Sequence, residues 1–191
     1  FFLGNTKKIE SKTYYITPVR ENKSFIFFSA IVYNDYIAKK ILKILDGEVD
    51  IILVDIEKKV QSKSKSLGLV NIERTAKDNV KKSKLYIYKA NDLTINAAET
   101  LLFNLFLKDK RGIGGKKILI IGVGNIGFKL ALKFVESGSE IYIYRRNLEI
   151  LKNIEQTINH IKPQGTKSKV RFLKNFPKNF DLYDVIICAA N

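Results

Sequence analysis

Short apolar runs alternate along the chain with segments in which apolar side chains recur every three or four residues. The runs predict buried strands, and the helical spacing predicts amphipathic helices. Strands are expected at residues 24–32, 49–56, 85–90, 116–123, 140–145, 169–174 and 184–190. Helices are expected at residues 33–46, 68–83, 91–110, 125–137 and 147–161. This alternation predicts an α/β fold with parallel sheets, because parallel strands are joined by helical crossovers.

The loop RGIGG at residues 111–115 divides the pattern into two halves. Its glycines precede a strand, so they indicate a hinge or turn. We expect a smaller α/β substrate or catalytic domain at residues 1–92, a linking helix and hinge at 93–115, and a second α/β domain at 116–191. The lysine- and serine-rich stretch at residues 57–66 is expected to be exposed. A first residue other than Met, and a last strand that ends just before Asn191, predict a fragment of a longer protein.

A glycine-rich turn joins a predicted strand to a predicted helix in the second half. Its sequence is Gly122-Val123-Gly124-Asn125-Ile126-Gly127, which matches G-x-G-x-x-G in the strand-to-helix context that gives the pattern meaning. Gly122 permits the tight turn, Gly124 lets the backbone approach a pyrophosphate, and Gly127 lets the helix pack closely on the strand. The helix N-terminus offers N–H groups and partial positive charge to phosphates. The turn therefore predicts a Rossmann-type doubly wound parallel sheet that binds a dinucleotide. A glycine turn that only packs a helix on a sheet is the alternative.

Two arginines follow the second strand of this domain, about 20 residues beyond the glycines, where the ribose 2′ position is recognised. An acidic residue at this place would bind the 2′-hydroxyl and repel a 2′-phosphate. Arg145 and Arg146 occupy it instead, and guanidinium groups match phosphate geometry. The expected cofactor is therefore NADP(H), with NAD(H) as the alternative. Ordinary surface charge is the alternative role of the two arginines. Asn147 is expected either to bind the same phosphate or to cap the next helix.

The last predicted strand, DVIICAAN, ends in small residues. Ala189 and Ala190 are expected to face the cofactor, because ligands bind at the carboxyl ends of parallel strands. An ordinary small-residue turn is the alternative. Cys188 is expected to be a buried core thiol rather than a nucleophile.

The second half resembles the C-terminal domain of shikimate dehydrogenases and their amino-acid-dehydrogenase-like relatives, including glutamyl-tRNA reductases. The resemblance covers residues 85–191 and rests on GVGNIG after KKILII, on RRN where shikimate dehydrogenases have Asn-Arg-Thr, and on FDLYDVIICAAN. It implies an α/β substrate domain, a linking helix and a nucleotide domain. The first half lacks the Ser-x-Ser and Asn-Val-Thr-x-Pro-x-Lys motifs and has no cysteine, so the resemblance does not identify the substrate.

Hydride transfer between a carbonyl and nicotinamide needs a proton donor near the oxygen. The candidates are Lys89 and Asp92, at the end of the third strand and the start of the linking helix, where Asn91 or Asp92 is also expected near the helix cap. Asn91-Asp92 resembles the family's Asn-Thr-Asp, whose aspartate pairs with the catalytic lysine. A lysine held by an aspartate can act as acid or base. A helix cap beside an exposed lysine is the alternative.

Several other functions find little support. The only histidine, His160, is near the end of an outer helix, and no Cys/His cluster has metal-ligand spacing. The net charge of +15 comes mostly from scattered lysines without interleaved aromatic residues, which favours a solvated surface over nucleic-acid binding. No apolar run reaches the ~20 residues of a membrane helix, and a single cysteine excludes an internal disulfide framework, so a cytoplasmic protein is expected.

We therefore expect an NADP-dependent oxidoreductase that transfers a hydride between nicotinamide and a small substrate bound between two domains. The alternative is a non-catalytic dinucleotide-binding regulatory module, which would bind the cofactor without turning over a carbonyl substrate. The sequence leaves the substrate, the direction of the reaction and the state of oligomerisation open.

Overall fold

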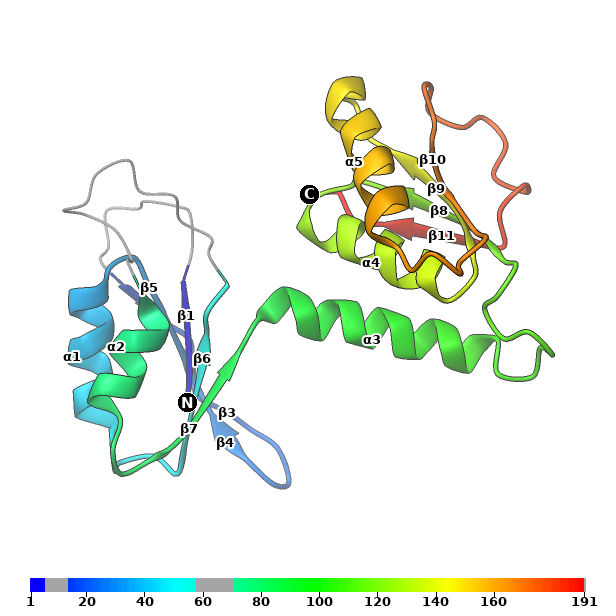
Figure 1. The fold of residues 1–191 in the computed structure, drawn as a ribbon. Helices are drawn as coiled ribbons and strands as arrows, with labels where there is room; N and C mark the ends of the chain where they lie inside the picture. The colour runs from blue at the N-terminus through cyan, green and yellow to red at the C-terminus, as the bar shows by residue number, and fades with distance from the viewer. Residues whose placement is uncertain (6–13, 58–70, 191) are drawn as a thin grey trace. The chain divides into compact units, whose positions relative to one another are not determined.

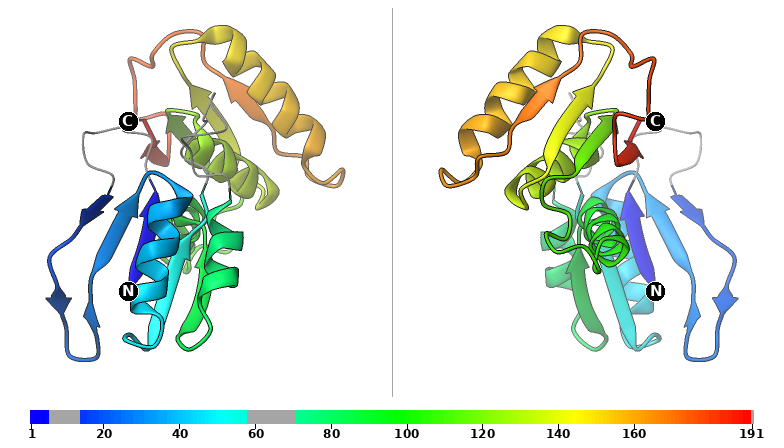
Figure 2. Two further views of the ribbon diagram at one scale, coloured as in Figure 1. Left: turned by 90° about the vertical axis from the view of Figure 1, so that its left-hand side faces the viewer. Right: turned by 90° about the vertical axis from the view of Figure 1, so that its right-hand side faces the viewer.

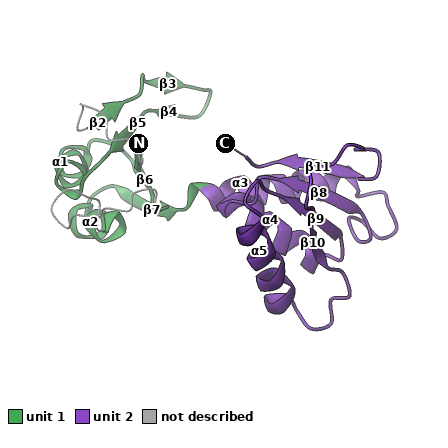
Figure 3. Ribbon diagram, turned by 90° about the horizontal axis from the view of Figure 1, so that it is seen from above, with its two compact units in different colours: residues 1–90 green, residues 91–191 purple. Residues whose placement is uncertain are grey.

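The computed structural model describes residues 1–5, 14–57 and 71–190 of the 191-residue chain. They form two compact units, Phe1–Ala90 and Asn91–Asn191, which are coloured separately in Figure 3. Apart from Glu57, the stretch at 57–66 that was expected to be exposed lies outside the described residues. None of the helices in the described ranges is long and apolar enough to cross a bilayer.

The first unit contains a five-stranded sheet in the order β2-β5-β1-β6-β7. All neighbouring strands are parallel except the edge strand β2, which runs antiparallel to β5. The strands are β1 (Phe2–Asn5), β2 (Tyr14–Ile16), β5 (Ser29–Val32), β6 (Ile51–Asp55) and β7 (Lys84–Tyr88). The central strand β1 was not predicted, because four residues that include a glycine make too short an apolar run.

The strand predicted at residues 24–32 is two strands in the structure. Its first part is β4 (Ile26–Phe27), which pairs with β3 (Arg20–Glu21) in a separate two-stranded sheet. Only its second part, β5, joins the main sheet. The break at Phe28 cannot be seen in the sequence, because the apolar run continues through it.

Two helices pack together on one face of the first sheet, α1 (Asp35–Leu45) and α2 (Ile72–Asn79), as Figures 1 and 2 show. Asn34 and Asn71 cap them by accepting the backbone N–H of Ile37 and Arg74. Both helices end before their predicted limits, since the periodic pattern runs on into residues that form turns. Their buried faces and the central strands make the first hydrophobic core.

Asp46 ties the end of α1 to the turn before β7. Its carboxylate accepts hydrogen bonds from the backbone N–H groups of Lys81, Lys82 and Ser83, at 2.8–3.0 Å. The bond from Ser83 is the largest of the causes that hold the pKa of Asp46 below its ordinary value. A carboxyl group whose pKa is lower in the folded state stabilises the fold above its unfolded pKa of about 3.9. That stabilisation is lost as the pH falls through the folded pKa.

We therefore expect Asp46→Asn to flatten the dependence of first-unit stability on pH below about pH 4, because the amide cannot titrate. Urea unfolding at a series of pH values would measure this dependence. Asp78→Asn is the matched control, since Asp78 forms only a long, exposed ion pair with Arg74 at 3.7 Å. An Asp46→Asn variant with the wild-type pH dependence would contradict the assignment.

The second unit contains a four-stranded parallel sheet in the order β10-β9-β8-β11. Its elements follow the chain as α3 (Ala90–Leu105), β8 (Lys117–Ile121), α4 (Asn125–Glu136), β9 (Glu140–Tyr144), α5 (Leu148–Ile161), β10 (Val170–Phe172) and β11 (Val185–Cys188). The predicted alternation of strand and helix is confirmed here, and residues 111–115 form the expected turn. The fold class is α/β, with parallel strands in both units.

Helices α4 and α5 lie on one face of this sheet (Figure 1). Ile118 and Ile120 of β8 and Ile141 and Ile143 of β9 point into the core beneath them and are fully buried. The opposite face of the sheet carries aromatic pairs instead, in which Tyr142 and Tyr144 contact Tyr183 and Phe176 at ring-centroid distances of 5.3 and 5.2 Å.

Cys188 is exposed, so the prediction of a buried core thiol was wrong. Along β11 the side chains alternate, and Ile187 packs against the core while Ile186 is exposed. The sequence predicted burial on both faces of this strand because VIIC is continuously apolar. The structure buries one face only.

Candidate functional site

The strand order of the second sheet reverses between β8 and β11, although all four strands are parallel. The chain places β9 and β10 on one side of β8 and then returns to place β11 on the other. In parallel α/β sheets, ligands bind at the carboxyl ends of the strands at such a switch point. Gly122 follows β8 here, and Ala189 and Ala190 follow β11. The predicted cofactor residues at the two ends of the domain sequence therefore lie side by side.

Gly122 and Gly127 are required by the packing of the protein itself. Gly122 has a φ of +91°, and a Cβ added to it would lie 2.4 Å from the backbone N of Ala190. A Cβ on Gly127 would lie 2.2 Å from the carbonyl oxygen of Gly122. Both distances are far below van der Waals contact, so no other residue fits at either position.

Gly124 is different, because a Cβ added there would meet no atom within 4 Å. Its φ of −89° is also accessible to other residues. Neither packing nor backbone strain therefore explains this glycine. Gly124 caps α4 without a side-chain hydrogen bond, and a side chain at this position would extend into open space beside the start of α4. That arrangement suits the close approach of a phosphate group.

The other residues of the turn divide between the core and the surface. Val123 is 1% exposed and belongs to the core, and Ile126 packs against the same core. Asn125 is the exposed first residue of α4. These two apolar side chains anchor the turn to the core of the second unit.

The two arginines have different surroundings. Arg145 follows β9 directly, and its Nη1 donates a hydrogen bond to the carbonyl oxygen of Val123 at 3.3 Å. The backbone joins the same two segments, since Gly122 N donates to Tyr144 O at 2.9 Å. Arg146 is exposed, and its side chain makes no hydrogen bond or ion pair with any residue in the described ranges. Arg145 thus braces the glycine turn, while the Arg146 guanidinium has its donors available.

Asn147 caps α5, as one of the two sequence interpretations expected. Its Oδ1 accepts the backbone N–H of Ile150 at 3.1 Å. This oxygen therefore has a partner within the helix. The cap also sets the start of α5 immediately after the two arginines. The expected position of His160 in the last turn of α5 is also confirmed.

The structure pairs Asp92 with a different lysine from the one predicted. Helix α3 begins at Ala90, so Asn91 and Asp92 lie in its first turn rather than at a cap. Asp92 Oδ1 accepts a hydrogen bond from Lys129 Nζ of α4 at 2.6 Å. Lys89 is exposed and is the last residue before α3. The ion pair between Lys129 and Asp92 joins α3 to α4.

The first sheet also has a switch point, between β1 and β6, which the sequence did not reveal. Buried polar side chains end both strands there: Asn5 Nδ2 donates to Asp55 O at 3.1 Å. Asp55 Oδ1 accepts the backbone N–H of Glu57 and Ala90. Burial raises the pKa of Tyr88, and the negative charge of Asp55 raises it further. The aspartate that ends the run IILVD was the available signal for this cluster.

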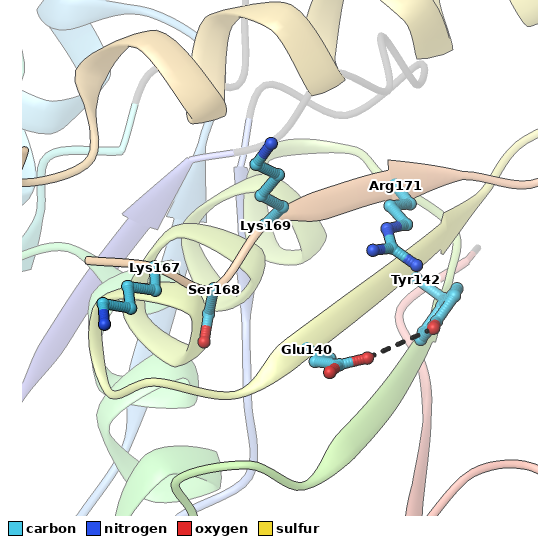
Figure 4. A pocket seen from close by; sticks show the side chains of 6 residues that line it. All are labelled: Glu140, Tyr142, Lys167, Ser168, Lys169 and Arg171. Carbon is cyan, nitrogen blue, oxygen red and sulfur yellow. Dashed lines mark hydrogen bonds between the residues drawn. The ribbon is translucent and has the colours of Figure 1, made fainter.

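A hollow of about 270 Å³ lies elsewhere on the second unit (Figure 4). It is lined by residues of β9, β10 and the segment before β10: Glu140, Tyr142, Lys167, Ser168, Lys169 and Arg171. The Tyr142 hydroxyl donates to Glu140 Oε2 at 3.3 Å. Glu140 begins β9, so the hollow reaches the amino edge of the sheet, opposite the glycine turn. Its basic side chains point in different directions and do not converge on one ligand position.

No cluster of three or more His, Cys, Asp or Glu side chains occurs within the described ranges, so the structure assigns no metal site there. The candidate site is built instead from backbone groups and two arginines.

Comparison with protein families matches residues 117–175 to the family described as NADP oxidoreductase coenzyme F420-dependent. The match covers less than a third of the chain, from β8 to just beyond β10. It supports the broader part of the sequence resemblance, a NAD(P)-binding oxidoreductase-like domain. It does not confirm the narrower resemblance to shikimate dehydrogenases and glutamyl-tRNA reductases. Comparison with curated protein sequences gives no match.

Similar solved structures include L-tryptophan dehydrogenase from Nostoc punctiforme, with 14% identity and a TM-score of 0.44 over 86% of this chain and 51% of that one. The dipicolinate synthase A chain from Bacillus subtilis has 14% identity and a TM-score of 0.38 over 83% and 46%. The PH0520 protein from Pyrococcus horikoshii OT3 has 17% identity and a TM-score of 0.35 over 98% and 61%. The chain spans about half the length of the first two.

Proposed function

We propose that the second unit binds NADP(H) and that the protein is an NADP-dependent oxidoreductase acting on a small molecule. The observation that carries the proposal is the open glycine Gly124 at the switch point, between two glycines that the packing requires. A turn that only packed a helix on a sheet would need Gly122 and Gly127 and would leave position 124 unrestricted. The family match to an NADP oxidoreductase over residues 117–175 supports the same class.

The residues present fit a dinucleotide. Gly124 leaves room for the pyrophosphate, and the N-terminus of α4 stabilises its negative charge. Ala189 and Ala190 bring only small side chains to the carboxyl end of β11, next to Gly122. Bound nicotinamide would supply the hydride or accept it. The chain's own contribution is to hold the cofactor and to select it by its 2′ group.

We assign the two arginines separate roles in this selection. Arg146 binds the 2′-phosphate through its available guanidinium, because planar N–H donors match phosphate oxygens. Arg145 positions the glycine turn through Val123 O and thereby acts on either dinucleotide. Asn147 caps α5 and keeps the arginines at the end of β9.

The test is calorimetric titration of wild type, Arg146→Ala and Arg145→Ala with NADPH and with NADH. Wild type is expected to bind NADPH more tightly than NADH. Loss of a charge-assisted phosphate contact, worth about 1.5–3 kcal/mol, predicts a ~10- to 150-fold weaker affinity of Arg146→Ala for NADPH and an unchanged affinity for NADH. Arg145→Ala is expected to weaken binding of both cofactors.

Lys167→Ala serves as the control, since it removes an exposed positive charge from the hollow at the amino edge of the sheet, opposite the glycine turn. If this variant loses as much NADPH affinity as Arg146→Ala, the effect comes from net charge rather than from a specific contact. Tighter binding of NADH than of NADPH by the wild type would contradict the proposed cofactor preference.

The catalytic roles of Lys89 and Asp92 stay predictions from the sequence. In the structure Lys89 lies at the carboxyl edge of the first sheet, one residue past β7, and Asp92 is held by Lys129. A non-catalytic dinucleotide-binding module is the alternative function. It would show the NADPH affinity described above without oxidation of NADPH in a screen of carbonyl substrates.

A further inference from the structure

Helix α3 has an inner face that fixes it to the second unit. Ile95 and Leu102 are buried in the core of that unit. Two ion pairs reinforce the contact, Lys129–Asp92 at 2.6 Å and Lys133–Glu99 at 2.5 Å, and both join α3 to α4. The buried side of α3 thus fixes the position of this helix within the second unit.

The outer side of α3 is apolar and exposed. Leu93, Leu101 and Leu105 are 57%, 69% and 66% exposed, and Ala97 lies exposed between them. These four residues follow one another at intervals of four, so they form a single i+4 ridge along the helix. We call Leu93, Ala97, Leu101 and Leu105 the α3 ridge. Scattered exposed leucines are ordinary on a protein surface, whereas a continuous ridge indicates a contact with another surface.

The charge around the ridge indicates what that surface is. The chain has 34 Lys and Arg residues and a net charge of +15, so copies of it repel one another. Residues 90–107 contain no Lys or Arg, and the two acidic residues among them, Asp92 and Glu99, are neutralised by α4. The α3 ridge is therefore a neutral face on a strongly cationic molecule. A second copy can approach there without placing like charges opposite each other.

The spacing of the ridge is also self-complementary. A twofold axis through the middle of the ridge sets two copies of α3 antiparallel, as an isologous interface requires. It places Ala97 of each copy against Leu101 of the other and brings Leu93 near Leu105. Small residues then face large ones at the centre, where the helices approach most closely, and leucines meet at both ends.

We propose that the protein forms a homodimer through the α3 ridge, with two antiparallel copies of α3 at the interface. An interface built mainly on one helix lies at the small end of the range for specific complexes. We therefore expect a dissociation constant in the micromolar range, with monomer and dimer in measurable equilibrium. The proposal does not depend on the identity of the cofactor.

Sedimentation equilibrium of the full chain, over concentrations on both sides of the micromolar range, tests the proposal. Wild type is expected to show a monomer–dimer equilibrium, and Leu101→Lys is expected to be monomeric with an unchanged circular dichroism spectrum and melting temperature. Ile44→Lys is the matched control, because Ile44 is 61% exposed on helix α1 of the other unit. It should dimerise like wild type.

A second arm tests the register. Ala97→Glu and Leu101→Lys chains are each expected to be monomeric alone. A mixture of them should form a heterodimer, because the twofold axis sets the introduced carboxylate of one chain against the introduced ammonium group of the other. A wild-type chain that is monomeric throughout would overturn the proposal. Contact of the ridge with the first unit of the same chain would appear as a monomer whose hydrodynamic radius grows in Leu101→Lys, and that result would also overturn it.

Discussion

Gly127→Ala is expected to destabilise the second unit by about 3 kcal/mol or more, in the range typical of overpacked and strained sites. The added Cβ would lie 2.2 Å from the carbonyl oxygen of Gly122 and 3.4 Å from Cγ2 of Ile120. The first of these is a backbone atom, so no side-chain rotation relieves the clash. The start of α4 would have to move away from β8, and the core beneath it contains fully buried residues such as Ile120 and Leu130.

Amide hydrogen exchange measures this effect unit by unit, which matters in a chain with two compact units. Amides of β8 and β9, such as those of Ile120 and Ile143, should exchange much faster in Gly127→Ala than in wild type. The amide of Val54, in β6 of the first unit, supplies an internal reference. Gly165→Ala is a matched control, because a Cβ there meets no atom within 4 Å. Unchanged exchange of β8 and β9 in Gly127→Ala would show that the packing of the turn differs from the structure.

Gly124→Ala is expected to have the opposite profile: a large loss of dinucleotide affinity with little loss of stability. No atom lies within 4 Å of the added methyl group, and only the weaker capping preference of alanine should matter, at about 1 kcal/mol or less. A pyrophosphate that contacts the backbone at Gly124 would meet the methyl group directly. We expect at least a ~10-fold weaker affinity for NADPH and for NADH alike, equivalent to about 1.4 kcal/mol.

Titration calorimetry with both dinucleotides, together with hydrogen exchange of β8, separates the two effects. Equal weakening for NADPH and NADH is the important detail, because the pyrophosphate is common to both and the 2′-phosphate is not. Gly124→Ala thus complements Arg146→Ala, which should affect NADPH alone. If Gly124→Ala bound both cofactors with wild-type affinity, the proposed role of Gly124 in binding the pyrophosphate would be contradicted, and with it the main support for the proposed function.

The roles of the glycines show how sequence and structure contribute to one site. The pattern G-x-G-x-x-G between a strand and a helix predicted the turn, because its glycines are only two or three residues apart and act on the local backbone. The pattern could not show which glycine has free space around it. The atom nearest a Cβ on Gly122 belongs to Ala190, which lies far from Gly122 in the sequence but next to it in the structure. The same holds for the arginines. Their place after β9 followed from the sequence, whereas the contact of Arg145 with Val123 depends on the pairing of β8 with β9.

Local signals determined the alternation of strands and helices in the second unit and the glycine turn, because these signals act over a few residues. They missed the short strand β1, and they left Asn147 as either a phosphate ligand or the cap of α5. Tertiary structure decided the strand order β10-β9-β8-β11, the pairing of Asp92 with Lys129 and the exposure of Cys188. Each of these depends on which segments, far apart in the sequence, come into contact. The spacing of apolar residues does not predict such contacts. A run of apolar residues predicts a strand, but only the packed sheet determines which of its faces is covered.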